Sequence, residues 1–207
     1  EKGEQWQRSL ALLSEMREAK LEPSVVSYNA GISSCEKGAQ WQRALALLSQ
    51  MRDAKLEPDV ISYTAGISVF EKAGQWKQAL SLLSEVCRAT LEPDVCTFSA
   101  GISACEKGEQ WQWALSLLSE VVEANLEPDA ISYTAGISAC KRVDQWWWVL
   151  VLFSEMVETS IDPSVINYSV AISACEKVGL WQLSLSLIGE MLVARLEPDV
   201  VSYSAGM

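Results

Sequence analysis

Hydrophobic residues recur along the chain at steps of three and four positions. Val25, Tyr28, Ile32 and Cys35 have this spacing, so they would share one side of an α-helix. A second apolar stripe follows after a short polar break and is formed by Trp41, Ala44, Leu45, Leu48 and Met51. No stretch shows the strict alternation that is typical of a β-strand. The pattern therefore predicts two successive amphipathic helices of about 12 and 14 residues.

The residues around these stripes predict where the helices begin and end. Gly38 lies in the polar break, and glycine is typical of a helix C-terminus. Pro58 would stop the second helix, because proline lacks the backbone N–H that a helix interior needs. Asp59 follows directly and is suited to cap the N-terminus of another first helix. Residues 25–59 thus form one helix–turn–helix unit.

This unit repeats with a step of 35 residues. Its proline recurs at Pro23, Pro58, Pro93, Pro128, Pro163 and Pro198. Its first tryptophan recurs at Trp6, Trp41, Trp76, Trp111, Trp146 and Trp181, where we expect it to pack in the core. Such a period is typical of an all-α solenoid, in which each unit buries its apolar face against its neighbours. We divide the chain into a second-helix fragment, five full repeats and the start of another, at 1–24, 25–59, 60–94, 95–129, 130–164, 165–199 and 200–207.

Two small residues also recur within the first helix. Glycine stands at Gly31, Gly66, Gly101 and Gly136. It favours a close approach between helices, with added flexibility as the alternative, because a glycine inside a helix costs about 1 kcal/mol relative to alanine. Cysteine stands at Cys35, Cys105, Cys140 and Cys175. These thiols form no C-x-x-C pair, so we interpret them as buried packing residues and expect no metal and no cofactor.

Charge and composition limit the classes of function. The chain has 16 basic and 27 acidic residues and a net charge of −11, which is the wrong sign for a general nucleic-acid binder. Histidine is absent, so this chain has no Ser-His-Asp or Cys-His catalysis and no mixed Cys/His zinc site. The longest apolar run, Trp146–Phe153, is far shorter than the roughly 20 residues of a membrane span. We therefore expect neither an enzyme nor a membrane protein.

The 35-residue hairpin resembles the pentatricopeptide repeat (PPR) family, of the P type. It closes with Leu-Glu-Pro-Asp at residues 56–59 and restarts with Val-Ile-Ser-Tyr at 60–63. The similar tetratricopeptide family has a period of 34 residues instead. The resemblance implies a right-handed α-solenoid of stacked antiparallel helix–turn–helix repeats. It also implies that the first helices line a groove for single-stranded RNA, with one base per repeat.

The family's base-reading places can be carried over onto this sequence. The fifth place of the five frames holds Asn29, Thr64, Ser99, Thr134 and Ser169. The closing place holds Asp59, Asp94, Asp129, Ser164 and Asp199. By resemblance, Asn with Asp favours uracil and Thr or Ser with Asp favours guanine, while Thr134 with Ser164 is an unusual pair to which we assign a purine. The RNA site implied is 5′-UGGRG-3′, where R is a purine.

The resemblance implies roles for two further sets of residues that recur every 35 positions. The second place, which would pack flat against the bases, holds Val26, Ile61, Cys96, Ile131 and Ile166. Cations that would contact the phosphates recur at the end of the first helix, at Lys37, Lys72, Lys107, Arg142 and Lys177. The alternative role of these cations is to complement the negative end of the helix dipole. The two roles are compatible.

The resemblance implies a sequence-selective RNA-binding scaffold that acts in RNA processing, stabilisation or editing in a plastid or mitochondrion. The chain starts in the middle of one repeat and stops early in another, so we expect a segment of a longer array that lacks the targeting sequence. The H-x-E and C-x-x-C elements of the deaminase-like domain that some PPR proteins carry are absent. The chain itself is expected to have no catalytic residue.

Three tryptophans do not follow the repeat: Trp113, Trp147 and Trp148. Most of the equivalent places hold polar residues, with Leu183 as one other apolar case. A solvent-facing stripe of this kind suggests a protein partner or self-association. Burial between neighbouring second helices is the alternative explanation. The stripe and the acidic charge favour a second hypothesis for the whole chain, a protein-binding solenoid with no RNA role.

Overall fold

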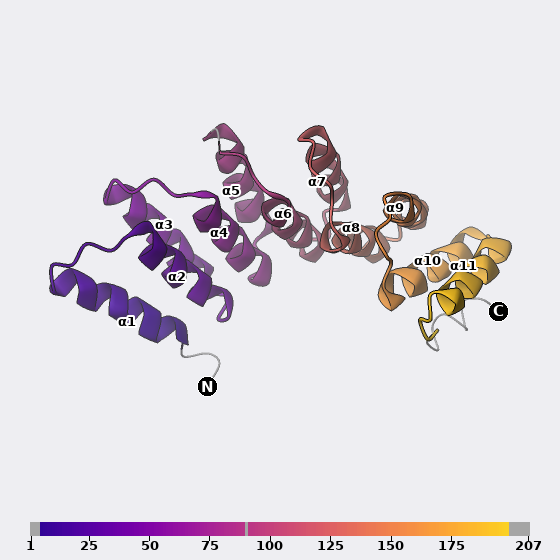
Figure 1. Ribbon diagram of the computed structural model, residues 1–207, viewed down its shortest axis with the longest axis horizontal. Helices are drawn as coiled ribbons and strands as arrows, with labels where there is room; N and C mark the ends of the chain where they lie inside the picture. Colours follow the sequence, from indigo (N-terminus) through magenta and orange to yellow (C-terminus); the bar gives the residue numbers. More distant parts are fainter. Residues whose placement is uncertain (1–4, 90, 199–207) are drawn as a thin grey trace. The chain divides into compact units, whose positions relative to one another are not determined.

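The computed structural model describes residues 5–89 and 91–198, and within them the chain forms 11 α-helices and no strand. These helices fall into two compact units, residues 1–108 and 109–207, which are described separately (Figure 1). None of the helices in the described ranges is long and apolar enough to cross a bilayer.

The first unit is a stack of helical hairpins. Its helices are α1 (Gln5–Glu18), α2 (Val25–Glu36), α3 (Trp41–Asp53), α4 (Val60–Lys72), α5 (Trp76–Arg88) and α6 (Val95–Lys107). Helices α2 and α3 form one hairpin, and α4 and α5 form the next. The first helices α2, α4 and α6 pack side by side in that order. This is the arrangement of an α-solenoid.

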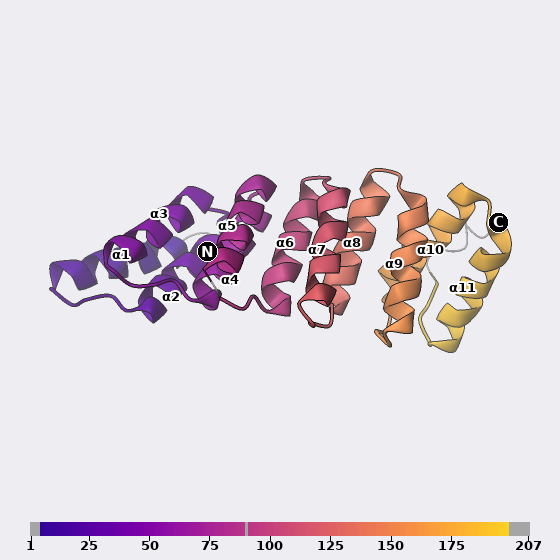
Figure 2. The same ribbon diagram turned by 90° about the horizontal axis from the view of Figure 1, so that it is seen from above.

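The second unit has the same construction. Its helices are α7 (Trp111–Glu123), α8 (Ala130–Arg142), α9 (Trp146–Glu158), α10 (Val165–Val178) and α11 (Trp181–Val193). The hairpins are α8 with α9 and α10 with α11, and α7 precedes them and packs on α8 (Figure 2). Both units therefore confirm the predicted all-α repeat architecture.

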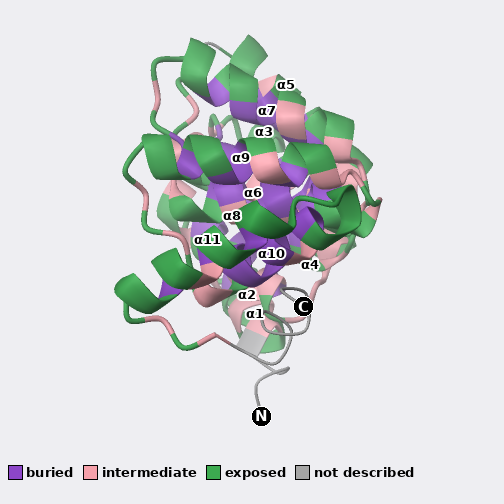
Figure 3. Ribbon diagram, turned by 90° about the vertical axis from the view of Figure 1, so that its right-hand side faces the viewer, coloured by how far each residue is buried: buried purple, intermediate pink, exposed green. Residues whose placement is uncertain are grey.

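The core lies where the helices face one another, and exposed residues cover the outer faces (Figure 3). In α2, Tyr28, Ile32 and Cys35 are buried as the apolar spacing predicts. In α3 the prediction was wrong at one position, since Leu45 is 45% exposed and Leu47 is buried instead. Helices α3, α5 and α9 each pack against their own first helix and also against the next one, so their buried face is wider than a single stripe.

The recurring glycines of the first helix allow the close approach that the sequence predicts. A Cβ atom added at Gly66 would lie 2.8 Å from Leu82 Cδ2 and 3.2 Å from Leu48 Cδ1. These leucines belong to the second helices on either side, α3 and α5. Glycine thus lets the two leucine side chains meet over the backbone of α4.

The turn after the first helix differs from the sequence prediction. The residue in the left-handed conformation is Ala39 (φ 49°), one position after Gly38. Gly38 instead leaves room for an aromatic ring, because a Cβ atom there would lie 2.9 Å from Trp6 Cδ1. Gly108 meets Trp76 in the same way, with the added Cβ 2.6 Å from Trp76 Cγ.

This contact explains where the periodic tryptophans lie. Trp6, Trp41 and Trp76 are half-buried rather than buried in the core, so that prediction was too strong. Each packs against the end of the next repeat's first helix, as Trp41 does with its ring centroid 6.4 Å from that of Phe70. Trp181, by contrast, is 64% exposed.

Replacing Ala39 by glycine is expected to stabilise the protein by about 1 kcal/mol, because the left-handed conformation costs alanine roughly that much and costs glycine little. The matched control is Gly74→Ala at the same place of the next repeat, where φ is 68°. It should destabilise the protein by a similar amount. Urea unfolding followed by circular dichroism measures both changes, and a loss of stability in Ala39→Gly would contradict this account of the turn.

Candidate nucleic-acid interface

The fifth-place residues lie at one level of adjacent first helices. In the first unit these residues are Asn29, Thr64 and Ser99, which follow the N-terminal turns of α2, α4 and α6, respectively. In the second unit, Thr134 and Ser169 hold this place in α8 and α10. Because neighbouring first helices pack side by side within each unit, the fifth-place residues form one row in each.

The first predicted pair is joined directly. Asn29 Nδ2 donates to Asp59 Oδ1 over 3.1 Å. Asp59 Oδ1 also accepts from the backbone N–H of Ser62 at 2.8 Å, so Asp59 caps α4 as the sequence predicts. Ser62 Oγ lies 2.6 Å from Asn29 Oδ1 and 2.7 Å from Asp59 Oδ1. The pair and the helix cap therefore share one hydrogen-bond network.

This network lowers the pKa of Asp59. Burial by itself raises the pKa, but hydrogen bonds from the Ser62 hydroxyl, the Ser62 backbone N–H and the Asn29 amide favour the charged form and outweigh it. The carboxylate at the closing place is therefore ionised at neutral pH. It presents hydrogen-bond acceptors only.

The second pair is joined through a third side chain. Thr64 Oγ1 lies 2.6 Å from Thr97 Oγ1, and Thr97 Oγ1 donates to Asp94 Oδ1 over 2.6 Å. Asp94 Oδ1 also accepts from the Thr97 backbone N–H at 2.8 Å and thereby caps α6. The connecting residue occupies the third place of the next repeat, as Ser62 does in the first pair.

The fourth pair uses a different connector, Asn167. Asn167 Nδ2 donates to Thr134 Oγ1 over 3.1 Å, and Ser164 Oγ donates to Asn167 Oδ1 over 2.6 Å. The Ser164 backbone N–H also donates to Asn167 Oδ1, at 2.9 Å. Here the acceptor oxygen lies on the third-place amide rather than on a closing carboxylate.

The third place, which joins the fifth and closing places, was not predicted from the sequence. Its residues are buried and polar: Ser62, Thr97, Ser132 and Asn167. The signal that could have revealed them is the recurrence of a small polar residue, every 35 positions, on a helix face that is otherwise apolar.

Two predicted pairs remain, Ser99 with Asp129 and Ser169 with Asp199. Ser99 and Asp129 belong to different units, and Asp199 lies outside the described residues. Asp129 Oδ1 accepts from the Ser132 backbone N–H at 2.8 Å and caps α8. Ser99 Oγ donates to the Val95 carbonyl over 2.7 Å.

The second and fifth places differ strongly in exposure. Val26 is 76% exposed and Ile61 is 65% exposed, whereas Asn29 is only 9% exposed and Ser99 only 4%. The other second-place residues are exposed as well: Cys96, Ile131 and Ile166. Each first helix therefore presents a projecting apolar side chain beside a recessed polar one.

The cations predicted to contact the RNA phosphates are exposed, but two of them already form ion pairs within the protein. All five cations lie on the surface: Lys37, Lys72, Lys107, Arg142 and Lys177. Lys72 Nζ and Lys107 Nζ lie 3.2 and 2.9 Å from Glu71 Oε1. The Glu71 side chain is 12% exposed, so one largely buried carboxylate holds two cations of neighbouring repeats.

The cysteines of the first helices serve packing, as predicted. Cys35, Cys105, Cys140 and Cys175 are buried and form no disulfide. Burial raises the pKa of the Cys105 and Cys140 thiols to about 12, so both are protonated and unreactive at neutral pH.

The non-periodic tryptophans lie on the surface of the second unit. Trp113 is 51% exposed, Trp147 is 65% exposed and Trp148 is 41% exposed, and Leu183 is 41% exposed. Trp147 and Leu183 line one groove, whereas Trp148 lines another. They belong to the second helices, whereas the fifth-place row belongs to the first helices.

Two family models match the chain. The model of the PPR repeat family matches residues 23–70 and 58–107. The model of the pentatricopeptide repeat domain matches residues 5–37, 116–178 and 151–207. No curated protein sequence matches the chain.

Several solved structures are similar to this chain. The pentatricopeptide repeat protein PPR10 from maize has 27% sequence identity and a TM-score of 0.70, and the match covers 99% of this chain and 29% of that one. PPR10 in complex with an 18-nt psaJ RNA element has 24% identity and a TM-score of 0.59, covering 97% and 33%. The PPR domain of Arabidopsis thaliana protein-only RNase P 1, in complex with tRNA, has 12% identity and a TM-score of 0.76, covering 84% and 91%. The chain thus spans about three tenths of the length of maize PPR10. Its 35-residue hairpins and the two family matches show that the chain belongs to the pentatricopeptide repeat family.

Proposed function

We propose that this chain is a scaffold that binds single-stranded RNA selectively, with one base per repeat. The observation that carries the proposal is the pairing of a recessed polar residue with a projecting aliphatic one on each first helix, as at Asn29 and Val26. A base could stack on the aliphatic side chain while its edge meets the polar one. The similar PPR10 structure in complex with an RNA element supports this reading.

The hydrogen-bond networks suggest which base each repeat prefers. Asn29 offers both an amide donor and a carbonyl acceptor, which suits the uracil edge with its carbonyl oxygens and N–H. The Thr64 hydroxyl has one proton and lies 2.8 Å from the Val60 carbonyl and 2.6 Å from Thr97 Oγ1, so it keeps a lone pair beside the Asp94 carboxylate. Two acceptors suit guanine, whose Watson–Crick edge carries N–H donors at N1 and N2. This chemistry agrees with the family's pairing rules and supports 5′-UGGRG-3′.

The test is a titration with labelled RNA at low salt. We expect 5′-UGGAG-3′ to bind at least several-fold more tightly than 5′-GAGGU-3′, which has the same composition in another order. Raising the salt concentration should weaken both, because a chain with a net charge of −11 holds RNA only through local cations. Equal affinity for the two oligonucleotides would contradict sequence reading.

The charged cluster around Glu71 leads to a prediction about affinity. Glu71→Gln should release Lys72 and Lys107 for phosphate contact and raise RNA affinity by about threefold to tenfold at low salt. Glu92→Gln makes the same change of net charge at an exposed loop position and is the matched control. Fluorescence anisotropy with labelled 5′-UGGAG-3′ measures both. An equal gain in the two variants would mean that net charge alone, and not the release of the two lysines, controls binding.

Family membership also suggests where this RNA binding takes place. We infer a role in RNA processing, stabilisation or editing within a plastid or mitochondrion, with any catalysis supplied by another domain or a partner. Fractionation of cells with an antibody against these repeats tests the location. Recovery of the protein in neither organelle would exclude it.

A further inference from the structure

The second helices of the second unit present an apolar and acidic outer surface. Helices α7, α9 and α11 contain no lysine or arginine. Their exposed side chains include Trp148, Val122, Val157 and Leu185. Exposed apolar residues that gather on neighbouring helices mark an interaction site more often than single scattered ones do. We call this face of α7, α9 and α11 the outer surface of the second unit.

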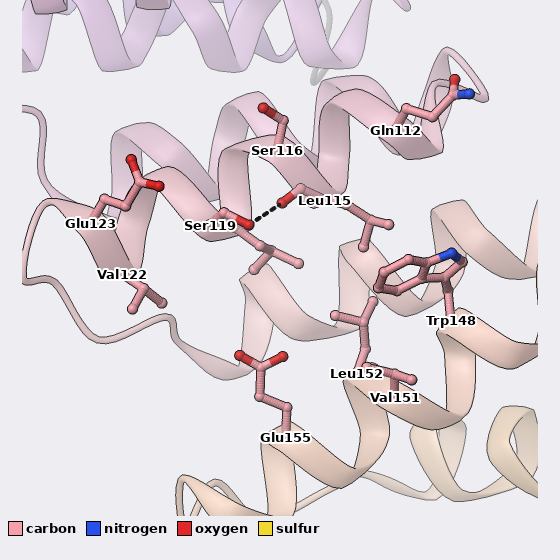
Figure 4. A pocket seen from close by; sticks show the side chains of 11 residues that line it. Gln112, Leu115, Ser116, Ser119, Val122, Glu123, Trp148, Val151, Leu152 and Glu155 are labelled. Atoms are coloured by element: carbon pink, nitrogen blue, oxygen red, sulfur yellow. Dashed lines mark hydrogen bonds between the residues drawn. The ribbon is translucent and has the colours of Figure 1, made fainter.

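A groove of about 520 Å³ runs between α7 and α9 (Figure 4). At one end the indole of Trp148 faces Leu115 across the groove. Val122 and Glu155 lie toward its other end. The groove therefore has an aromatic and aliphatic floor with a carboxylate at its side.

Two more grooves follow between α9 and α11. One, of about 500 Å³, includes Trp147, Leu183 and Glu158. The other, of about 230 Å³, includes Val157, Leu183, Glu158 and Glu190. Apolar grooves with glutamates at their sides thus extend from α7 across α9 to α11.

In the first unit, arginine side chains cover the equivalent surface of the second helices. Arg52, near the end of α3, pairs with Glu85 of α5 and donates to the Tyr63 hydroxyl over 3.4 Å. Arg17 of α1 donates in the same way to the Tyr28 hydroxyl over 2.7 Å and to Gln50 Oε1 over 2.8 Å. A guanidinium therefore bridges consecutive repeats at this position.

The second unit keeps the partners of this bridge but lacks the arginine. The places equivalent to Arg52 hold Val122, Val157 and Leu192. Glu155 remains where Glu85 stands, yet it forms no ion pair within the described part of the chain. The Tyr133 hydroxyl, which corresponds to that of Tyr63, is buried near Glu155 and has no hydrogen bond of normal geometry there. The outer surface of the second unit therefore has the carboxylate of Glu155 and the hydroxyl of Tyr133, but no guanidinium between them.

We propose that this outer surface binds an amphipathic helix of another protein, in which lysine or arginine flanks a stripe of leucine or valine. The apolar stripe would lie in the groove between α7 and α9, as amphipathic helices do in other helical receptors. The basic side chains would meet Glu155, Glu158 and Glu190, which line or edge the grooves. Charge complementarity of this kind selects the partner and speeds its association.

Charge also argues against the other occupants of this surface. A second copy of the chain docking the same face would bring glutamates against glutamates without any lysine or arginine from α7, α9 or α11. RNA would be repelled by the same carboxylates. The proposed helix binding is therefore separate from RNA binding by the first helices.

The test uses a fluorescein-labelled 18-residue synthetic helix with leucines at helical spacing and lysines on both flanks. Two control peptides replace every lysine by glutamate or scramble the order of the residues. We expect the unmodified protein to bind the basic helix at least tenfold more tightly than either control, as measured by fluorescence anisotropy. Trp148→Gln should weaken this binding at least fivefold, because it removes the indole from the groove. The fold should accept glutamine there, since Gln78 occupies the equivalent place. Val122→Arg, which supplies the missing guanidinium, should weaken it at least tenfold.

The matched control is Gln78→Ala in the first unit, which occupies the repeat place of Trp148 and should leave helix binding unchanged. All three variants should bind labelled 5′-UGGAG-3′ as the unmodified protein does, so the two binding activities are scored independently. Equal binding of the basic and acidic helices would overturn the proposal, as would unchanged binding in both Trp148→Gln and Val122→Arg. It would also be overturned if sedimentation showed concentration-dependent dimers of the unmodified protein that Trp148→Gln abolishes, because the occupant would then be a second copy.

Discussion

Asp59→Ala is expected to weaken both the start of α4 and the reading of the first base. The carboxylate accepts from the Ser62 backbone N–H and from Asn29 Nδ2. Loss of an N-cap costs about 1 kcal/mol, and the Ser62 and Asn29 groups left without an acceptor raise the total to about 2–3 kcal/mol. The amide of Asn29 would also be free to turn, so the preference for uracil at the first position should fall by about tenfold. Urea unfolding and titration with 5′-UGGAG-3′ and 5′-CGGAG-3′ measure the two effects.

The same carboxylate gives this variant a defined pH dependence. Because its folded pKa lies below its usual value, Asp59 stabilises the protein above about pH 4, the pKa of an aspartate in an unfolded chain. This contribution disappears as the pH falls through the folded pKa. The difference in stability between the unmodified protein and Asp59→Ala should therefore be constant near pH 7 and shrink below about pH 4.

Asp59→Asn is the control for the cap alone. Asparagine caps helices about as well as aspartate, so the loss of stability at pH 7 should stay below about 1 kcal/mol. A loss as large as that of Asp59→Ala would show that the charge, rather than the cap geometry, stabilises α4. If neither variant changes the base preference, Asp59 does not position Asn29.

The starts of the first helices were predictable because local chemistry determines them. The aspartate after Pro58 caps the next helix, and α4 does begin at Val60, directly after Asp59. Pro58 itself does not end α3, which stops at Asp53, before the left-handed Lys55 (φ 57°). The buried stripe of α2 was predictable for a similar reason, since Tyr28, Ile32 and Cys35 follow the helical spacing of three and four residues. These features depend on residues that are close together in the sequence.

Features that depend on two repeats at once were not predictable in the same way. Leu47 is buried because the second helix meets two first helices, which a single apolar stripe does not indicate. Gly38 accepts the ring of Trp6 from the preceding repeat, so its role is distinct from that of a helix terminator. Glu71 collects Lys107 from the next repeat, 36 positions away. In each case the deciding partner lies about one repeat period away along the chain.

The candidate site shows the same division. The fifth and closing places follow from the family pattern, but the buried third place that joins them appears only in the structure. Ser62, Thr97 and Asn167 hold this place with different chemistry. The closing residue therefore cannot be interpreted without the third-place residue three positions later.

The fourth repeat provides the sharpest test of this interpretation. Its closing residue is Ser164, and the acceptor oxygen beside Thr134 belongs to the amide of Asn167. That amide directs an N–H toward the Thr134 hydroxyl, so the repeat lacks the two-acceptor pair that suits guanine. Ser164→Asp combined with Asn167→Ser would install the aspartate and serine that residues 129 and 132 already provide at the start of α8. Guanine should then be preferred over adenine at the fourth base by about tenfold, a typical value for one good base contact.

Comparison of 5′-UGGGG-3′ with 5′-UGGAG-3′ measures this preference in the double variant and in the unmodified protein. Because an aspartate and a serine still cap the helix, the stability of the double variant should stay within about 1 kcal/mol of the original. Asn167→Ser alone removes the amide without adding a carboxylate, and it should leave the ratio of the two affinities low. If the single variant gains the guanine preference as fully as the double one, the amide of Asn167 merely blocks the base. If neither gains it, the third place has no part in reading RNA, and the networks at the helix starts serve stability alone.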